Sequence, residues 1–173
     1  MTKIWLLALC ILISACSVDV QRYSQEKPTL DLREYFTGKV DGWGMFQKRS
    51  SEVVKRFHVL VEGHSEGDNL IMHEAFTYSD GTRQTRVWTL RPDGNGRWLG
   101  TAGDVVGDSL GEVAGNALHW RYVLNLPVDG TTYQVHFDDW MYLLDPDTLA
   151  NRSAMTKFGV ELGQVTLFFR KER

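Results

Sequence analysis

The chain has 173 residues, with 19 Lys and Arg against 22 Asp and Glu, which gives a formal net charge of −3. No basic patch or run occurs, so nucleic acid is not an expected partner. Both cysteines, Cys10 and Cys16, lie near the start of the chain. The remainder therefore has no thiol for a disulfide, a thiolate nucleophile or a zinc site, and its length suits one domain with a sizeable core.

The first elements in chain order are those of a bacterial lipoprotein export signal. Lys3 supplies a charged start, residues 4–13 form an apolar run, and Ile13-Ser14-Ala15-Cys16 follows. These features describe a secretory signal, and the run is too short to span a bilayer of about 30 Å. Because a cysteine follows the cleavage point, we expect residues 1–15 to be removed and Cys16 to be acylated with diacylglycerol and a further fatty acid such as palmitate. The alternative is an ordinary secretory signal with a chance cysteine.

Several acyl chains on Cys16 would anchor the protein stably to a membrane without a transmembrane helix. In lipoproteins of Gram-negative bacteria an Asp after the acylated cysteine tends to retain the protein in the inner membrane, and here that position is Ser17. This resemblance implies the periplasmic face of the outer membrane. Residues 16–30 are polar, include Pro28 and show no apolar period. We therefore expect a lipidated Cys16 and a flexible tether there, followed by a single domain over residues 31–173.

From Tyr35 onward, short segments of alternating polarity are separated by turn residues, which is typical of a β-protein. Consecutive strands joined by tight turns predict an all-β, antiparallel up-and-down barrel of about eight to ten strands, because closure removes the open sheet edges. A two-sheet β-sandwich is the alternative. The expected strands lie near residues 52–62, 69–78, 84–91, 97–103, 109–126, 132–144, 148–156 and 160–170.

One hairpin can be predicted to the level of its register. If Asp129-Gly130 form a two-residue turn, Tyr122 lies opposite Phe137, and one face of the hairpin is apolar. The exception on that face is Asp139, which would lie opposite Trp120. Asp139 is interpreted as an inward acid that lies at the barrel mouth or pairs with an arginine such as Arg152. The alternative is a polar anchor for the headgroup of a ligand.

A near-regular series of glycines occupies positions 100, 103, 107, 111 and 115. Glycines within strands commonly mark bulges and sharp bends, so we expect these features here. The alternative is a ligand or loop that lies close against bare backbone. No Gly-Lys-Ser/Thr follows, which excludes a phosphate-binding loop.

The sequence gives little support to an enzyme. In the predicted register His119 and His136 are about 13 Å apart along the strands, too far to share a metal ion. No Gly-x-Ser-x-Gly motif occurs. We therefore predict no catalytic residue, no metal and no cofactor.

Two motifs resemble those of a known family: Gly42-Trp43-Gly44-Met45-Phe46-Gln47, and Asp138-Asp139-Trp140-Met141-Tyr142-Leu143. Through them the chain is similar to uncharacterised envelope lipoproteins of proteobacteria that form a domain of unknown function. The resemblance spans nearly the whole predicted domain. It also implies that the gene lies near genes for fatty-acid-modifying enzymes. A weaker likeness is to lipocalins, in which an arginine packs over the Trp of a Gly-x-Trp motif; here the glycine and tryptophan are adjacent.

The preferred hypothesis is a barrel that binds an apolar ligand such as a fatty acid or lipid, because inward aromatic side chains suit such a site. The alternative is a structural or accessory envelope lipoprotein whose barrel is fully packed. An enzyme is the third and least favoured reading. The candidate ligand-binding residues are Trp43, Trp120, Tyr122, Phe137, Asp139 and Arg152.

Overall fold

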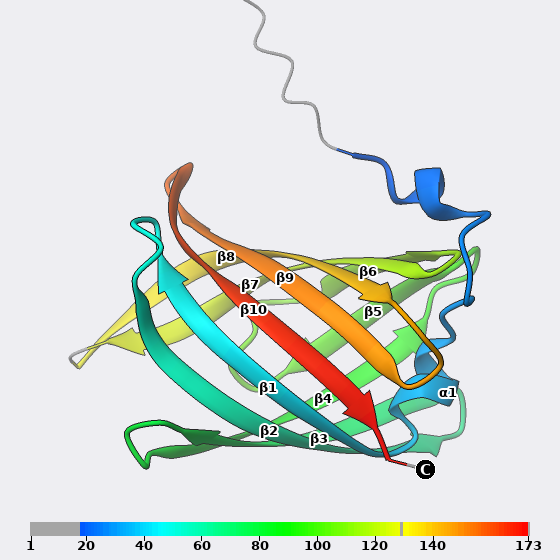
Figure 1. Cartoon of the computed structure of the whole chain (residues 1–173), viewed down its shortest axis with the longest axis horizontal. Coiled ribbons are helices and arrows are strands. Elements are labelled where there is room, and N and C mark those ends of the chain that lie inside the picture. Colours follow the sequence, from blue (N-terminus) through cyan, green and yellow to red (C-terminus); the bar gives the residue numbers. More distant parts are fainter. Residues whose placement is uncertain (1–17, 129, 173) are drawn as a thin grey trace, which may run out of the picture.

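The computed structural model describes residues 18–128 and 130–172, so the predicted export signal and Cys16 lie outside the described residues. These residues form ten antiparallel strands in a closed barrel, in the order β1-β10-β9-β8-β7-β6-β5-β4-β3-β2 (Figure 1). Strands that are neighbours in sequence pair with each other, and β1 pairs with β10 to close the sheet. The predicted up-and-down barrel is confirmed, and the two-sheet sandwich is wrong.

The strands are joined by short connections and are preceded by two short helices. Within the described part of the chain, no helix is long and apolar enough to cross a membrane. The elements are η1 (Val20–Tyr23), α1 (Leu32–Phe36), β1 (Gly38–Lys48), β2 (Val53–Glu66), β3 (Asn69–Tyr78), β4 (Arg83–Pro92), β5 (Arg97–Ala102), β6 (Ser109–Ala114), β7 (Ala117–Val128), β8 (Thr131–Leu143), β9 (Thr148–Lys157) and β10 (Val160–Lys171).

Two differences from the expected strands have local causes. The segment predicted as one strand over residues 109–126 divides into β6 and β7 at Gly115, whose φ of +55° turns the chain. Strand β1 is missing from the predicted set because Gly42 and Gly44 interrupt its alternation of apolar and polar side chains. The backbone of both glycines pairs with β2 and β10, so the strand forms although its side chains do not alternate in polarity.

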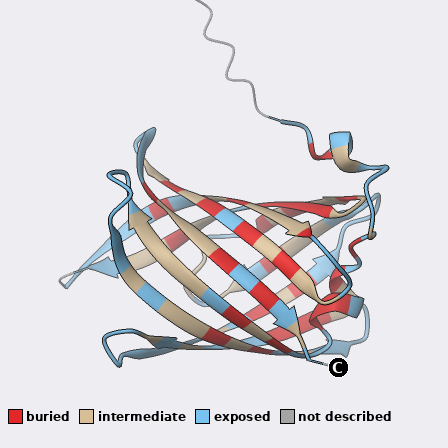
Figure 2. Cartoon of the chain, in the orientation of Figure 1, coloured by how far each residue is buried: buried red, intermediate tan, exposed pale blue. Residues whose placement is uncertain are grey.

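The predicted register of the β7–β8 hairpin is confirmed. Tyr122 pairs with Phe137 and Trp120 pairs with Asp139. The pairing of Val128 with Thr131 leaves room for a two-residue connection, of which Gly130 has a φ of +79°; Asp129 lies outside the described residues. Buried and exposed positions alternate along the strands, as Figure 2 shows, so one side of each strand faces the barrel interior.

Helix α1 closes one end of the barrel. Its Leu32, Tyr35 and Phe36 side chains are buried, and Asp31 caps the helix by accepting a hydrogen bond from the Glu34 backbone N–H. The last carbonyls of the helix are satisfied by Lys171 of β10, whose Nζ donates to backbone oxygens of Glu34, Tyr35 and Thr37 at 2.7–2.8 Å. These contacts hold the helix to the sheet. We call this end the closed end and the opposite one the open end.

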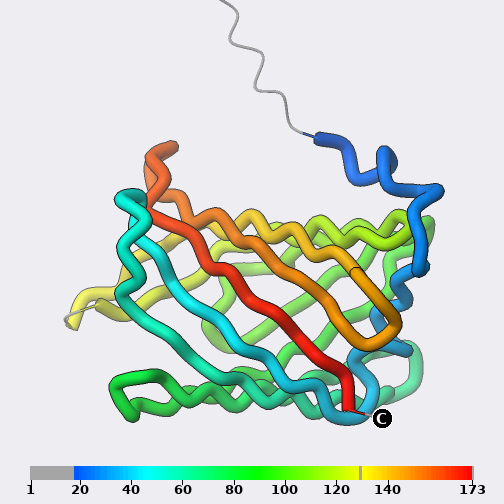
Figure 3. The backbone as a smooth tube through the Cα atoms, viewed as in Figure 1, coloured from blue at the N-terminus to red at the C-terminus, as the bar shows by residue number. Residues whose placement is uncertain are grey.

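Residues 18–30, here called the N-terminal strap, correct the expectation of a flexible tether. Val20 is 1% exposed and packs with Ala114 and Ala117, and the Tyr23 ring lies 5.3 Å from that of Tyr142. The Leu30 backbone N–H donates to the Gly115 carbonyl at 2.8 Å. The strap therefore follows the outer wall at the closed end (Figure 3).

Three glycines of the series lie where a side chain would collide with Trp120 or with the strap, and the series marks no bulges in β5 and β6. The pairing of β5, β6 and β7 is unbroken, and the register shifts lie instead at Phe46/Gln47 and Glu161/Gly163. A Cβ atom at Gly100 would lie 2.6 Å from Cζ2 of Trp120, and one at Gly111 would overlap the same indole. At Gly115 a side chain would overlap the Tyr23 carbonyl. The close approach of a chain segment, the alternative considered above, thus holds at Gly115.

We expect Gly111→Val to lower the free energy of unfolding by about 1–3 kcal/mol, because the added side chain must displace the Trp120 ring in a packed interior. Equilibrium urea denaturation measures the change. The control is Gly103→Ala, since a Cβ atom there meets nothing within 4 Å. Equal stability of the Gly111→Val and Gly103→Ala variants would contradict the packing role of Gly111.

Candidate functional site

A cavity of about 770 Å³ occupies the interior of the barrel. The diameter of a barrel grows with its number of strands, so ten strands enclose a wider interior than eight. Leu32 and Phe36 of α1 form the floor at the closed end. The lining continues to the exposed side chains of Thr82, Arg83 and Val128, so the cavity opens to solvent at the open end.

Aromatic rings from three strands form much of the wall. Trp88 of β4 meets Trp120 and Tyr122 of β7 edge to face, with ring centroids 5.9 and 5.5 Å apart. Tyr122 stacks on Phe137 of β8 at 4.9 Å. Such rings offer apolar faces to a ligand together with a few polar edges. The remaining apolar part of the wall includes Phe46, Phe57, Met72, Phe76, Leu90, Leu118, Leu124, Met155, Val165, Leu167 and Phe169.

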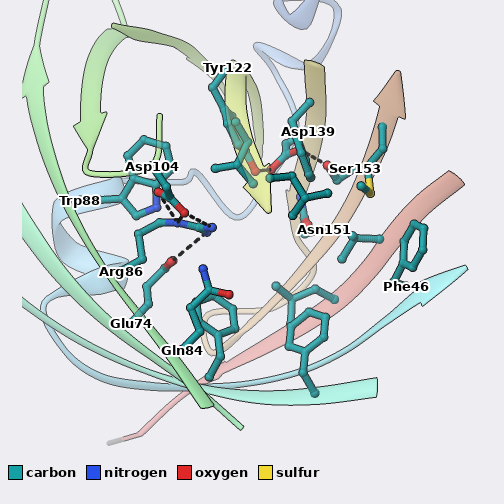
Figure 4. Close-up of a pocket in the computed structure, with 18 of the residues that line it drawn as sticks. Phe46, Glu74, Gln84, Arg86, Trp88, Asp104, Tyr122, Asp139, Asn151 and Ser153 are labelled. Carbon is teal, nitrogen blue, oxygen red and sulfur yellow. Dashed lines mark hydrogen bonds and ion pairs between the residues drawn. The ribbon is translucent and has the colours of Figure 1, made fainter. Parts of the chain in front are cut away.

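One side of the cavity carries an ion cluster of Glu74, Arg86 and Asp104 (Figure 4). Arg86 donates from Nε and Nη2 to the Asp104 carboxylate at 2.9–3.1 Å, and its Nη1 lies 3.5 Å from Glu74 Oε2. The Arg86 and Glu74 side chains are only 13% and 12% exposed. Burial raises the pKa of Glu74 to about 6, against the opposing attraction of Arg86.

The ion cluster depends on a connection that folds back against the wall. Glu74 and Arg86 face each other on the paired strands β3 and β4. Asp104 follows β5, where its carbonyl accepts from the Asn125 backbone N–H at 2.8 Å and Val105 pairs with Leu124. Strands β5 and β6 are short, so this connection pairs with the edge of β7 beyond β6 and brings the Asp104 carboxylate to Arg86.

A second group of polar side chains in the cavity consists of Asp139 on β8 and Ser153 on β9. The Asp139 residue is 6% exposed. Its carboxylate accepts hydrogen bonds from the Ser153 hydroxyl and, at 3.5 Å, from the Tyr122 hydroxyl. Burial raises the pKa of Asp139 to about 7, and the hydrogen bond from Ser153 opposes this shift. The inward acid predicted from the hairpin register is thus present. Its pairing with Arg152 is wrong, because Arg152 donates instead to Gln164 at 3.0 Å.

The structure brings four of the six candidate residues to the cavity, and these are Trp120, Tyr122, Phe137 and Asp139. Trp43 and Arg152 lie on the outer wall, which corrects the expectation that they share the site. On β1 the inward position belongs to Gly42, so Trp43 points outward, is 53% exposed and packs near His58. On β9 the inward side chains are Asn151 and Ser153, which leaves Arg152 outside.

The ion cluster is the part of the site that the sequence analysis missed. Glu74 alternates with the apolar Met72 and Phe76, and Arg86 alternates with Trp88, so a period of two could have placed both side chains inside. The histidines lie elsewhere: His119 stacks on Trp140, and His58 contacts Asp41 at 2.7 Å. Within residues 18–128 and 130–172, no three His, Cys, Asp or Glu side chains are grouped so that they could hold a metal ion.

We expect Asp139→Asn to stabilise the protein more at pH 8 than at pH 4. An unfolded Asp releases its proton near pH 4, whereas the folded protein holds that of Asp139 up to about pH 7. The folded state therefore binds more protons between these values, and its stability falls as the pH rises through this window. Each pKa unit corresponds to about 1.4 kcal/mol, so the free energy of unfolding of the variant relative to the parent should rise by a few kcal/mol, in order of magnitude, between pH 4 and pH 8.

Urea denaturation of parent and variant at the two pH values measures this difference. Asp108→Asn serves as the control because Asp108 is exposed on the outer surface, beside Arg91. A stability difference between parent and Asp139→Asn that is the same at both pH values would contradict the raised pKa.

Three solved structures are similar to this chain, and the first two support the fold. Rv2717c from M. tuberculosis matches with a TM-score of 0.61 and 15% identity, over 86% of this chain and 99% of that one. The S-type phycobiliprotein lyase CPES from Guillardia theta matches with a TM-score of 0.58 and 7% identity, over 83% and 94%. A designed fluorescence-activating β-barrel matches with a TM-score of 0.45 and 12% identity, over 83% of this chain and 99% of that one.

No curated protein matches the sequence. A family model does match, over residues 10–171, which is nearly the whole chain. The chain belongs to the family described as protein of unknown function (DUF3833).

Proposed function

We propose that this protein binds an apolar or amphipathic small molecule of the lipid class inside its barrel. The observation that carries the proposal is the cavity of about 770 Å³, which is closed by α1 at one end and open at the other. Pockets for small ligands usually have volumes of about 300–1,000 Å³ and mostly apolar walls. An accessory protein with a fully packed barrel, the alternative function, would need no such space.

The character of the wall supports the same proposal. Apolar ligand surface that leaves water for the cavity contributes about 25 cal/mol per Å². The aromatic side chains of Trp88, Trp120, Tyr122 and Phe137 are held by ring contacts with one another, so they lose little freedom when a ligand binds. Helix α1, fixed by Lys171, keeps solvent from entering at the floor.

We further propose that the barrel is a lipid-anchored protein on the periplasmic face of the outer membrane. The proposal rests on the sequence of residues 3–17, in which a charged start, an apolar run and Ile-Ser-Ala precede Cys16, and Ser17 follows it.

We expect Val165→Trp to weaken ligand binding at least about tenfold, because the indole would occupy the cavity that Val165 lines. The measurement is the fluorescence titration of the full chain, stripped of copurified lipid, with the apolar dye Nile red. Thr166→Trp is the matched control, since the next residue on β10 does not line the cavity. Equal affinity of both variants, or no binding by the parent protein, would contradict binding inside the barrel.

We expect Cys16→Ser to abolish incorporation of radiolabelled palmitate and to release the protein from the membrane fraction. Cys10→Ser is the control, because residue 10 lies in the segment expected to be removed. Labelling and fractionation of Cys16→Ser at the parent level would overturn the proposed anchor without touching the proposed ligand site.

A further inference from the structure

At the level of Glu74 and Asp139 carboxyl groups outnumber cations, whereas the other cationic lining residues, Lys55 and Arg83, stand at the open end. The ion cluster contributes two carboxylates and one guanidinium, and Asp139 adds a third carboxyl group from β8. Figure 4 shows Tyr122 lying between the ion cluster and Asp139, with Arg86 pointing into the space that they border. Arg86 and Asp139 also interact electrostatically, so the two groups act on a common region.

The charge of Arg86 is already balanced by the two carboxylates of the ion cluster. Its Nε and Nη2 donate to Asp104, and its Nη1 faces Glu74, so every nitrogen of the guanidinium already meets a carboxylate. Lys55 is the cavity-lining lysine, and it stands at the open end with Asp80 at 3.0 Å from its Nζ. A carboxylate carried to the level of Glu74 and Asp139 would therefore meet acidic oxygen atoms without a free cation beside it.

A hydrocarbon chain is also a poor neighbour for these groups. It would remove water from Glu74, Asp104 and Asp139 and offer no hydrogen bond in return, which is unfavourable for buried polar atoms. A hydroxyl, amine or ammonium group can instead donate hydrogen bonds to the carboxylates. The wall thus favours a ligand that places a hydrogen-bond donor beside these carboxyl groups and its apolar part toward the floor formed by α1.

We propose that the cavity takes an amphiphile whose polar group is a neutral or positively charged hydrogen-bond donor, and that it discriminates against a carboxylate of the same chain length. This inference rests on the proposed ligand binding and narrows it, since a free fatty acid becomes the disfavoured member of the class. Glu74 and Asp139 are the residues that set the preference.

The test compares three ligands that differ only in their polar group, namely dodecylamine, dodecan-1-ol and dodecanoate, as competitors of Nile red on the full chain at pH 8. We expect the amine and the alcohol to displace the dye at concentrations at least about tenfold lower than dodecanoate. In the double variant Glu74→Gln and Asp139→Asn, the ratio between amine and acid should fall toward one.

The matched control is the double variant Glu62→Gln and Asp108→Asn, which removes two exposed carboxylates that do not line the cavity and should leave the ratio unchanged. Dodecanoate that binds as tightly as the amine to the parent protein overturns the inference, and this result does not depend on whether any variant folds. A loss of dodecanoate affinity in Lys55→Gln would then place the carboxylate at the open end. Failure of Nile red and of all three competitors to bind overturns the proposed function and the inference together.

Discussion

The pairing of β1 with β10 determines what the molecule can contain. By joining the first and last strands it closes a sheet of ten strands, and closure gives every strand one face toward a common interior. Gly42 takes an inward position at this seam, where a Cβ atom would lie 3.0 Å from the Phe169 side chain and 3.2 Å from that of Leu167, both on β10. The seam is therefore closely packed, while the space enclosed by the whole ring exceeds what the inward side chains fill. Opening the seam would expose two strand edges and the apolar wall together.

Inside the barrel, the low polarity of the surroundings changes the properties of the few polar groups. Burial favours the protonated forms of Glu74 and Asp139, and Arg86 counteracts this most strongly at Glu74. A buried ion pair of this kind gives little net stability, because the desolvation of its charges offsets their attraction. The three carboxyl groups of the wall therefore add little to folding stability, and their role belongs to the proposed recognition of a ligand.

The fold could be predicted from the sequence because turn residues and alternation are local signals. The two-residue connection and the apolar face of the β7–β8 hairpin together specified the pairing of Tyr122 with Phe137 and the inward position of Asp139. The strap could not be predicted in this way, since Val20, Tyr23 and Leu30 are widely spaced among polar residues and gain their contacts only from the finished barrel.

The candidate site was predicted in part for a related reason. Inward residues on a hairpin of known register were placed correctly. Trp43 was misplaced because the glycines of β1 hide its alternation, and Arg152 was misplaced because it was chosen as a charge partner for Asp139 without regard to the alternation on β9. The ion cluster joins two paired strands with a connection that returns to β7. Its third member, Asp104, is positioned by backbone contacts that no local pattern reveals.

The N-terminal strap also decides how an anchored barrel would be oriented. The strap begins two residues after Cys16 and is fastened at the closed end, near Gly115. With the proposed acyl chains on Cys16, the molecule would be tied to its membrane on the side of the α1 plug, and the entrance would be directed toward the aqueous compartment. A ligand of the proposed kind would then reach the entrance from that compartment and not directly from the lipid to which the protein is tied.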